Sequence, residues 1–317
     1  MRVSRSRWAW IRLLGGAGII AVLWWRLGTG AFVAGIRVVD ASAMLAASGI
    51  GVATTVFSAW RWRLVAAGLG LRLPLRAAIA DYYTALFLNA ALPGGVLGDV
   101  NRAVRHGREE GDVGRSVRAV MLERTAGQVV LVGVGLAVLL TVPSPVSEQL
   151  DVYGPAASIV AVTAAVAGLV VLAWGARMRR GTSRVAGAAR AGAAEIRAGL
   201  LSRRAWPGVV LASTIVLAGH LATFLVAARV AGSTVPLLRL APLMVLALLA
   251  MSVPVNVGGW GPREGVTAWA FGAAGWSATQ GLTVAVAYGV LAFVAALPGA
   301  LVLATRALSR PAPAPHG

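Results

Sequence analysis

Long apolar segments constrain this chain more than any other feature of its sequence. Six segments are apolar over roughly 20 residues, the length that crosses the hydrocarbon core of a bilayer as a helix. They are residues 8–27, 41–60, 119–142, 155–175, 206–228 and 279–305. Because lipid cannot hydrogen-bond to free backbone groups, such segments must be helical. The sequence therefore predicts an all-α polytopic membrane protein with about six full transmembrane helices.

The arginines predict how these helices are oriented. All 29 basic residues are arginine, and the formal net charge is +18. Most arginines fall in residues 1–12, 61–76, 98–118, 176–205 and after 305. Basic residues concentrate in cytoplasmic loops, so we expect a multi-pass protein of the cytoplasmic membrane with both termini cytoplasmic. In such a protein the positive charge reports topology and contact with anionic headgroups, and no nucleic-acid partner is predicted.

Two further apolar segments, 77–97 and 240–275, are interrupted by proline and glycine. Segment 77–97 lies between two arginine-rich loops, so it must enter from the cytoplasm and return there. Segment 240–275 either makes two passes or dips in from outside and returns. Re-entrant helical hairpins fit both cases. The expected architecture is thus about six spans plus two broken hairpins.

The two halves of the chain then match in layout. Each half, about 8–142 and 155–306, contains two spans, a broken segment and a further span, and the halves start on opposite sides of the membrane. This order predicts an inverted-topology repeat, in which the broken segments point to a central binding site. We expect one membrane-embedded domain over residues 1–306 and a disordered cytoplasmic tail over 307–317.

The first broken segment carries polar residues together with helix breakers. An unwound turn leaves backbone N–H and C=O groups that must line a cavity or contact a ligand, and glycines let the backbone approach that ligand closely. Asp99 has an alternative role as the N-cap of the following helix, and both roles can hold. The candidate substrate-binding residues here are Asn89, Pro93, Gly94, Gly95, Gly98, Asp99 and Arg102.

The second broken segment, PVNVGGWGPREG (254–265), places two charges between apolar sequences. Pro262 fits the first turn of a new helix, whose N-terminus favours the carboxylate of Glu264. Arg263 gains there only by binding an anion such as phosphate; the alternative is an arginine that snorkels to the membrane surface. The candidate binding residues here are Pro254, Gly258, Gly259, Gly261, Arg263 and Glu264.

A third charged pair, Glu123–Arg124, lies at the start of a span and is also assigned to substrate binding. Neighbours on a helix point about 100° apart, so neither this pair nor Arg263–Glu264 is expected to pair internally. Charges within a membrane face a partner or a water-filled cavity. We therefore hypothesise crossed pairs, with Glu123 on Arg263 and Arg124 on Glu264 or Asp99.

Other polar features carry weaker signals. RWRL at 61–64 ends a predicted span and favours anchoring at the interface, with headgroup binding as the alternative. His220 favours a hydrogen-bonded packing role over catalysis. The chain has no cysteine, no metal-ligand spacing and no nucleotide-binding motif, so we predict neither a metal nor a cofactor. Transport would be passive, ion-coupled or driven by a partner.

The order of these motifs resembles a known family. Asn89, then LPGG and GDxxR, then Glu123–Arg124, then PxxxGGxGxRE at 254–264, is similar to the lysylphosphatidylglycerol synthase transmembrane family, a flippase-like membrane domain. The resemblance covers about residues 10–305. It departs where the family often has Gly-Gly-Asp and this chain has Leu97–Gly98–Asp99.

The resemblance implies a translocase for an anionic phospholipid or a polyprenyl-linked lipid. We expect no enzyme and no catalytic residue, because the loops 98–118 and 176–205 are too short to hold an aminoacyltransferase domain. Two alternatives stay open. One is an accessory membrane subunit that partners an envelope-building enzyme, and the other is an intramembrane lipid-modifying transferase with Asp99 or Glu264 as base.

Overall fold

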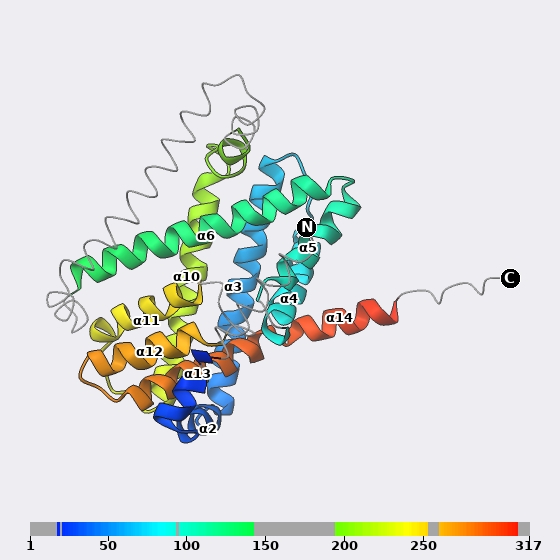
Figure 1. Cartoon of the computed structure of the whole chain (residues 1–317). Coiled ribbons are helices and arrows are strands. Elements are labelled where there is room, and N and C mark those ends of the chain that lie inside the picture. The colour runs from blue at the N-terminus through cyan, green and yellow to red at the C-terminus, as the bar shows by residue number, and fades with distance from the viewer. Residues whose placement is uncertain (1–17, 20, 93–94, 143–193, 253–259, 310–317) are drawn as a thin grey trace.

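The computed structural model describes residues 18–19, 21–92, 95–142, 194–252 and 260–309 (Figure 1). The named elements in these ranges are all α-helices. They are α2 (Gly30–Arg37), α3 (Ala41–Gly68), α4 (Leu75–Ala91), α5 (Leu97–Glu109), α6 (Val113–Thr141), α10 (Trp206–Val230), α11 (Leu237–Met251), α12 (Pro262–Ala273), α13 (Ala278–Ala296) and α14 (Pro298–Leu308). The all-α prediction is confirmed.

Four helical segments in the described residues are long and apolar enough to span a membrane. They are α3, α6, α10 and the continuous stretch Ala278–Leu308 that contains α13 and α14, with mean hydropathies of 1.4 to 2.2. They correspond to the predicted spans 41–60, 119–142, 206–228 and 279–305. The predicted span 155–175 lies outside the described residues, as does most of 8–27.

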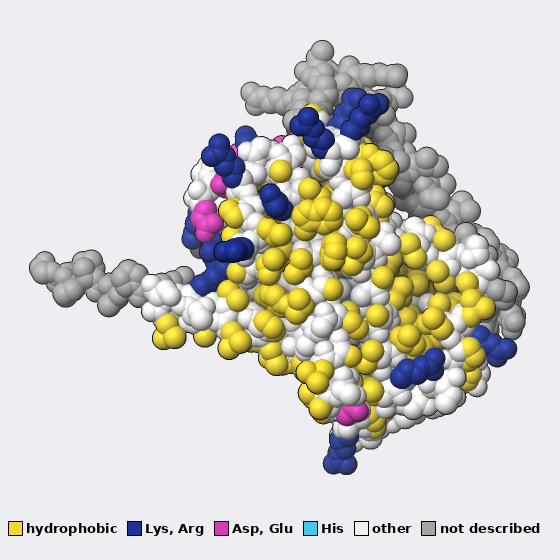
Figure 2. Space-filling view, turned by 180° about the vertical axis from the view of Figure 1, so that it is seen from behind, with side chains coloured by type: hydrophobic (Ala, Val, Ile, Leu, Met, Phe, Trp, Pro, Cys, Tyr) yellow, Lys and Arg dark blue, Asp and Glu magenta, His cyan; other side chains and the backbone are white. Residues whose placement is uncertain are grey.

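The outer surface matches a membrane environment. Large apolar side chains such as Trp25, Leu45 and Leu301 are 70 to 84% exposed, where water-soluble proteins rarely expose contiguous apolar patches. Figure 2 shows hydrophobic side chains over the middle of one face, with arginines gathered mainly at its upper rim. The chain is a multi-pass membrane protein.

Local chemistry sets several helix ends. Asp40 caps α3 by accepting a hydrogen bond from the Ala43 N–H at 2.8 Å, and Asp112 caps α6 through the Arg115 N–H at 2.8 Å. Pro262 is the first residue of α12, as predicted, since its missing N–H costs nothing at that position. The two segments that proline and glycine interrupt each form two separate helices. The first forms α4 and α5, and the second forms α11 and α12.

The helices pack around a central pair. α3 and α10 contact each other closely, and a Cβ added at Gly219 would lie 2.2 Å from the Thr54 methyl group. α4 and α5 lie on one side of this pair, and α11 and α12 on the other (Figure 1). One buried apolar cluster draws mainly on α3 to α6 and another mainly on α10 to α13. The candidate site lies between these clusters.

Candidate functional site

A cavity of about 630 Å³ opens between the two groups of helices. Its walls come from α3, α4, α6, α10, α11 and α13, together with Trp260 and Arg263. Three arginines line it, namely Arg61, Arg124 and Arg263, while no Asp or Glu appears among the described residues of the wall. The described wall therefore presents cations to the cavity, and the carboxylates that pair with them lie behind it.

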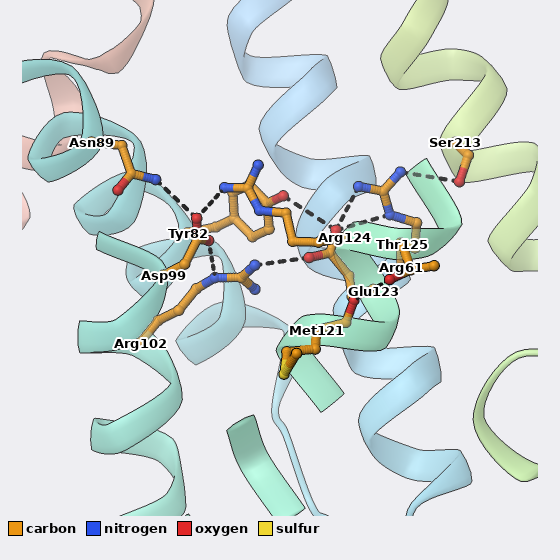
Figure 3. A network of polar contacts seen from close by, with 10 residues as sticks. All are labelled: Arg61, Tyr82, Asn89, Asp99, Arg102, Met121, Glu123, Arg124, Thr125 and Ser213. Atoms are coloured by element: carbon orange, nitrogen blue, oxygen red, sulfur yellow. Dashed lines mark hydrogen bonds and ion pairs between the residues drawn. The ribbon is translucent and has the colours of Figure 1, made fainter. Parts of the chain in front are cut away.

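Glu123 is the centre of a buried polar network behind this wall (Figure 3). It is completely buried and accepts hydrogen bonds from Arg61 Nε at 2.9 Å, Arg102 Nη2 at 2.8 Å and the Tyr82 hydroxyl at 3.2 Å. These partners come from α3, α5 and α4. A carboxylate shared by two guanidiniums is satisfied in a place where an isolated charge would be very costly.

Arg102 is the best-enclosed cation of the network. Its side chain is fully buried, and its guanidinium carbon lies 4.6 Å from the ring centre of Trp62 and 4.5 Å from that of Tyr82. Besides Glu123, it donates from Nε to Asp99 at 2.9 Å. Arg102 does not line the cavity, so its role in this arrangement is to tie α3, α4, α5 and α6 together.

Asp99 links Arg102 to the cavity wall. It accepts from Arg124 Nη2 at 2.5 Å and from the Asn89 amide nitrogen at 3.0 Å. The positive charges of Arg124 and Arg102 on either side of this carboxylate favour its charged form. The carboxylate is therefore ionised in this site.

Asn89, and not Asp99, satisfies the N-terminal end of α5. α5 begins at Leu97, so Asp99 lies within its first turn and is not the N-cap. The Asn89 side-chain oxygen accepts a hydrogen bond from the Gly98 N–H at 2.7 Å and so satisfies a free donor of the helix end. A Cβ at Gly98 would lie 2.1 Å from the Ala85 carbonyl oxygen, which explains the glycine.

The second charged pair is organised differently from the prediction. Arg263 Nε donates to Glu264 at 2.9 Å, so these sequence neighbours do pair. Glu264 turns back to accept from the Gly261 N–H at 2.7 Å, which brings its carboxylate beside Arg263. Arg263 is only 3% exposed, so it is not a snorkelling arginine. Its guanidinium carbon lies 5.2 Å and 5.0 Å from the ring centres of Trp260 and Tyr288.

The hypothesis of crossed pairs is therefore correct in one part. Arg124 pairs with Asp99, but Glu123 pairs with Arg61 and Arg102 instead of Arg263, and Glu264 pairs with Arg263 instead of Arg124. The reason is local. Each carboxylate meets a nearer guanidinium on its own side of the cavity.

The remaining predicted residues have clear positions or lie outside the described residues. Gly95 lines the cavity with φ of +60°, a conformation that glycine adopts without strain. The residues not described are Pro93, Gly94, Pro254, Gly258 and Gly259. Among the described residues no group of three His, Asp or Glu side chains could hold a metal ion.

Sequence reasoning missed Arg61 as a site residue. Interface anchoring is wrong for it, because α3 continues to Gly68 and Arg61 is only 4% exposed, with Nη1 donating to Ser213 at 3.0 Å. A signal was present: Thr54, Ser58 and Arg61 follow the helical period on a largely apolar helix. His220 is hydrogen-bonded as expected, at 3.0 Å from the Tyr288 hydroxyl.

Fold and site together define a class: a polytopic helical membrane protein with an arginine-lined central cavity. The model of the family described as lysylphosphatidylglycerol synthase TM region matches residues 9–299. Because the match covers most of the chain, this protein belongs to that family. No curated protein and no solved structure matches the chain.

Proposed function

We propose that this chain moves an anionic lipid, either a phospholipid or a polyprenyl-linked lipid, between the leaflets of the cytoplasmic membrane. The observation that carries the proposal is the central cavity, with three arginines and no described carboxylate on its wall. Guanidinium groups suit phosphate because they present several N–H donors in a planar fork. In this proposal the protein translocates its lipid without changing it chemically.

Arg124 is the cation best placed to meet a headgroup. Its side chain is 43% exposed, whereas those of Arg61 and Arg263 are 5% and 4% exposed. Its hydrogen bond to Asp99 uses Nη2, and its Nε has no hydrogen-bond partner in the described part of the chain. Nε is enclosed, so an incoming phosphate would meet the exposed part of this guanidinium instead.

The proposal includes an inverted-topology repeat with re-entrant hairpins and cytoplasmic termini. Packing supports the repeat, because each helix contact in one half has a counterpart in the other. α3 packs on α4 as α10 packs on α11, α4 on α5 as α11 on α12, and α5 on α6 as α12 on α13. Such repeats place a substrate site near the membrane midplane between the halves, which is where a headgroup would have to cross.

Reconstitution of the purified chain into liposomes tests the function. We expect it to move acyl-labelled phosphatidylglycerol between leaflets, measured by the accessibility of the label to a membrane-impermeant quencher. Arg124→Gln should abolish most of this movement. Arg118→Gln is a matched control, since Arg118 lies on the same helix with 46% exposure but pairs with Glu195 outside the cavity.

The alternatives have distinct outcomes in the same experiment. A chemically altered lipid would indicate a transferase, and movement only after addition of a co-purifying envelope enzyme would indicate an accessory subunit. Equal movement by protein-free liposomes, the intact chain and Arg124→Gln would contradict the proposed function.

A further inference from the structure

One wall of the cavity carries neutral polar groups that a bare phosphate would not need. α3 contributes Thr54 and Ser58, and α10 contributes Ser213, His220 and Thr223. Their spacings of three, four and seven residues place them on one face of each helix. The two faces meet where α3 and α10 pack together. A stripe of hydroxyl groups therefore lies in the same cavity as the three arginines.

The hydrogen bonds of these hydroxyls determine what they can still bind. Thr54 and Thr223 each donate to a carbonyl of their own helix at 3.0 Å, at Gly51 and Gly219. Their hydrogens are thus engaged, and their oxygens remain as acceptors. A phosphate diester carries only acceptors and cannot use them. A hydroxyl group on the ligand can.

Ser58 and Ser213 add donors to the same wall. Ser213 accepts from Arg61, which leaves its hydroxyl hydrogen free to donate. Ser58 forms no hydrogen bond within the described residues, although it is only 4% exposed and lines the cavity. A buried polar group normally has a partner, so Ser58 is suited to a polar group of the ligand.

The same cavity is poorly suited to a headgroup with an ammonium group. No described residue of the wall is acidic. Aromatic rings could bind a cation through their faces, but Trp260 and Tyr288 already flank Arg263, and Tyr82 lies against Arg102. The remaining aromatic ring of the described wall, Phe293, packs against Phe87. An ammonium would meet guanidiniums first, and the nearby carboxylates are already paired with those guanidiniums.

We propose that the cavity selects headgroups that combine a phosphate diester with free hydroxyl groups and rejects aminoacylated, cationic ones. This inference rests on the proposed lipid transport, and it narrows the substrate class. Two kinds of lipid share the required chemistry: glycerophospholipids with a polyol headgroup, and polyprenyl phosphates that carry a sugar.

Competitive lipid binding to the full chain in phosphatidylcholine nanodiscs, measured by native mass spectrometry, tests the selectivity. The probes are phosphatidylglycerol, phosphatidylethanol with the same charge and no free hydroxyl, the lysyl ester of phosphatidylglycerol, and a polyprenyl-phosphate hexose. We expect phosphatidylglycerol or the hexose lipid to bind about tenfold more tightly than phosphatidylethanol, as one or two hydrogen bonds provide. Whichever of phosphatidylglycerol and the hexose lipid binds more tightly identifies which of the two lipid classes the cavity binds. Equal binding of all four lipids would overturn the inference.

Two variants test whether the hydroxyl groups of α3 and α10 cause the preference for phosphatidylglycerol. The double variant Ser58→Ala, Thr223→Val should remove the preference for phosphatidylglycerol over phosphatidylethanol, because it weakens phosphatidylglycerol binding much more than phosphatidylethanol binding. Thr125→Val is the control, since this threonine is exposed and does not line the cavity. Full retention of the preference in the double variant would contradict the assignment.

Transport measured in parallel separates the two proposals. Selective binding without movement between leaflets supports the inference and contradicts the proposed function. Movement of phosphatidylglycerol, phosphatidylethanol and the lysyl ester at equal rates supports the function and overturns the inference.

Discussion

Replacing Glu123 by glutamine tests whether the buried network holds the first group of helices together. The substitution keeps the shape of the side chain but removes the negative charge. Arg61 and Arg102, which are 4% and 0% exposed, would then lose the carboxylate that each of them contacts. Asp99 would still pair with Arg102, but Arg61 would be left with neutral acceptors, namely the Ser213 hydroxyl and the amide oxygen of the new glutamine.

The structure sets the size of the effect. Removing one partner of a buried ion pair leaves an uncompensated charge and costs about 3–5 kcal/mol. At about 2 °C per kcal/mol, the lower end for large domains, the apparent melting temperature should fall by about 6–10 °C. The loss should exceed that of a neutral hydrogen bond, which contributes about 1 kcal/mol.

Thermal denaturation of the detergent-solubilised chain measures this difference. Glu109→Gln is the matched control: Glu109 is 52% exposed and pairs with Arg105 on the surface, where ion pairs contribute about 0–1 kcal/mol. Adding Arg61→Met to Glu123→Gln should recover part of the loss, because it removes the buried cation that is left without a carboxylate. If Glu123→Gln melts within 2 °C of the unmodified chain, a threshold set by the same scaling, the network does not stabilise the fold.

Three further predictions concern the cavity and α5. Arg124→Gln should reduce lipid transport at least tenfold while shifting the melting temperature less than Glu123→Gln, because Arg124 faces the cavity; similar losses of stability would refute this. Gly289→Ala should impair transport, since a Cβ there would lie 2.5 Å from Arg263 Nη2, whereas Gly272→Ala, with its nearest neighbour at 3.7 Å, should not. Burial lowers the pKa of His106 below its usual 6.5, so its neutral form favours folding above pH 6.5, and this contribution is lost as pH falls below that value. The melting temperature between pH 7.5 and pH 5 should therefore fall less in His106→Gln, provided the variant folds.

The spans and breaks could be predicted because each depends on local sequence. Apolar length alone predicted α3, α6, α10 and α13 with α14, and proline with glycine predicted the interruptions between α4 and α5 and between α11 and α12. The length of an apolar segment and the backbone preferences of proline and glycine are properties of short stretches of sequence. The positions of the spans and breaks can therefore be predicted from one sequence.

Ion-pair partners could not be predicted in the same way. Glu123 meets Arg61 across 62 positions of sequence, and nothing near either residue specifies that contact. Arg61 looked like the end of a span because it is the first charge after an apolar segment. In fact the helix continues past it, and burial is tolerated because a carboxylate from another helix is present. Only the packing of α3 against α6 brings the two together.

The order of charges in the network explains how one cluster can both stabilise the fold and attract an anion. The contacts form an alternating chain that runs from Arg61 through Glu123, Arg102 and Asp99 to Arg124. This series of alternating charges has one more cation than anions, and both of its end members are arginines. These two ends line the cavity, whereas Arg102 in the middle does not. The excess positive charge is thus exposed where a headgroup can reach it, while each carboxylate is enclosed between two guanidiniums. Substitution in the middle should therefore affect folding first, and substitution at Arg124 should affect binding first.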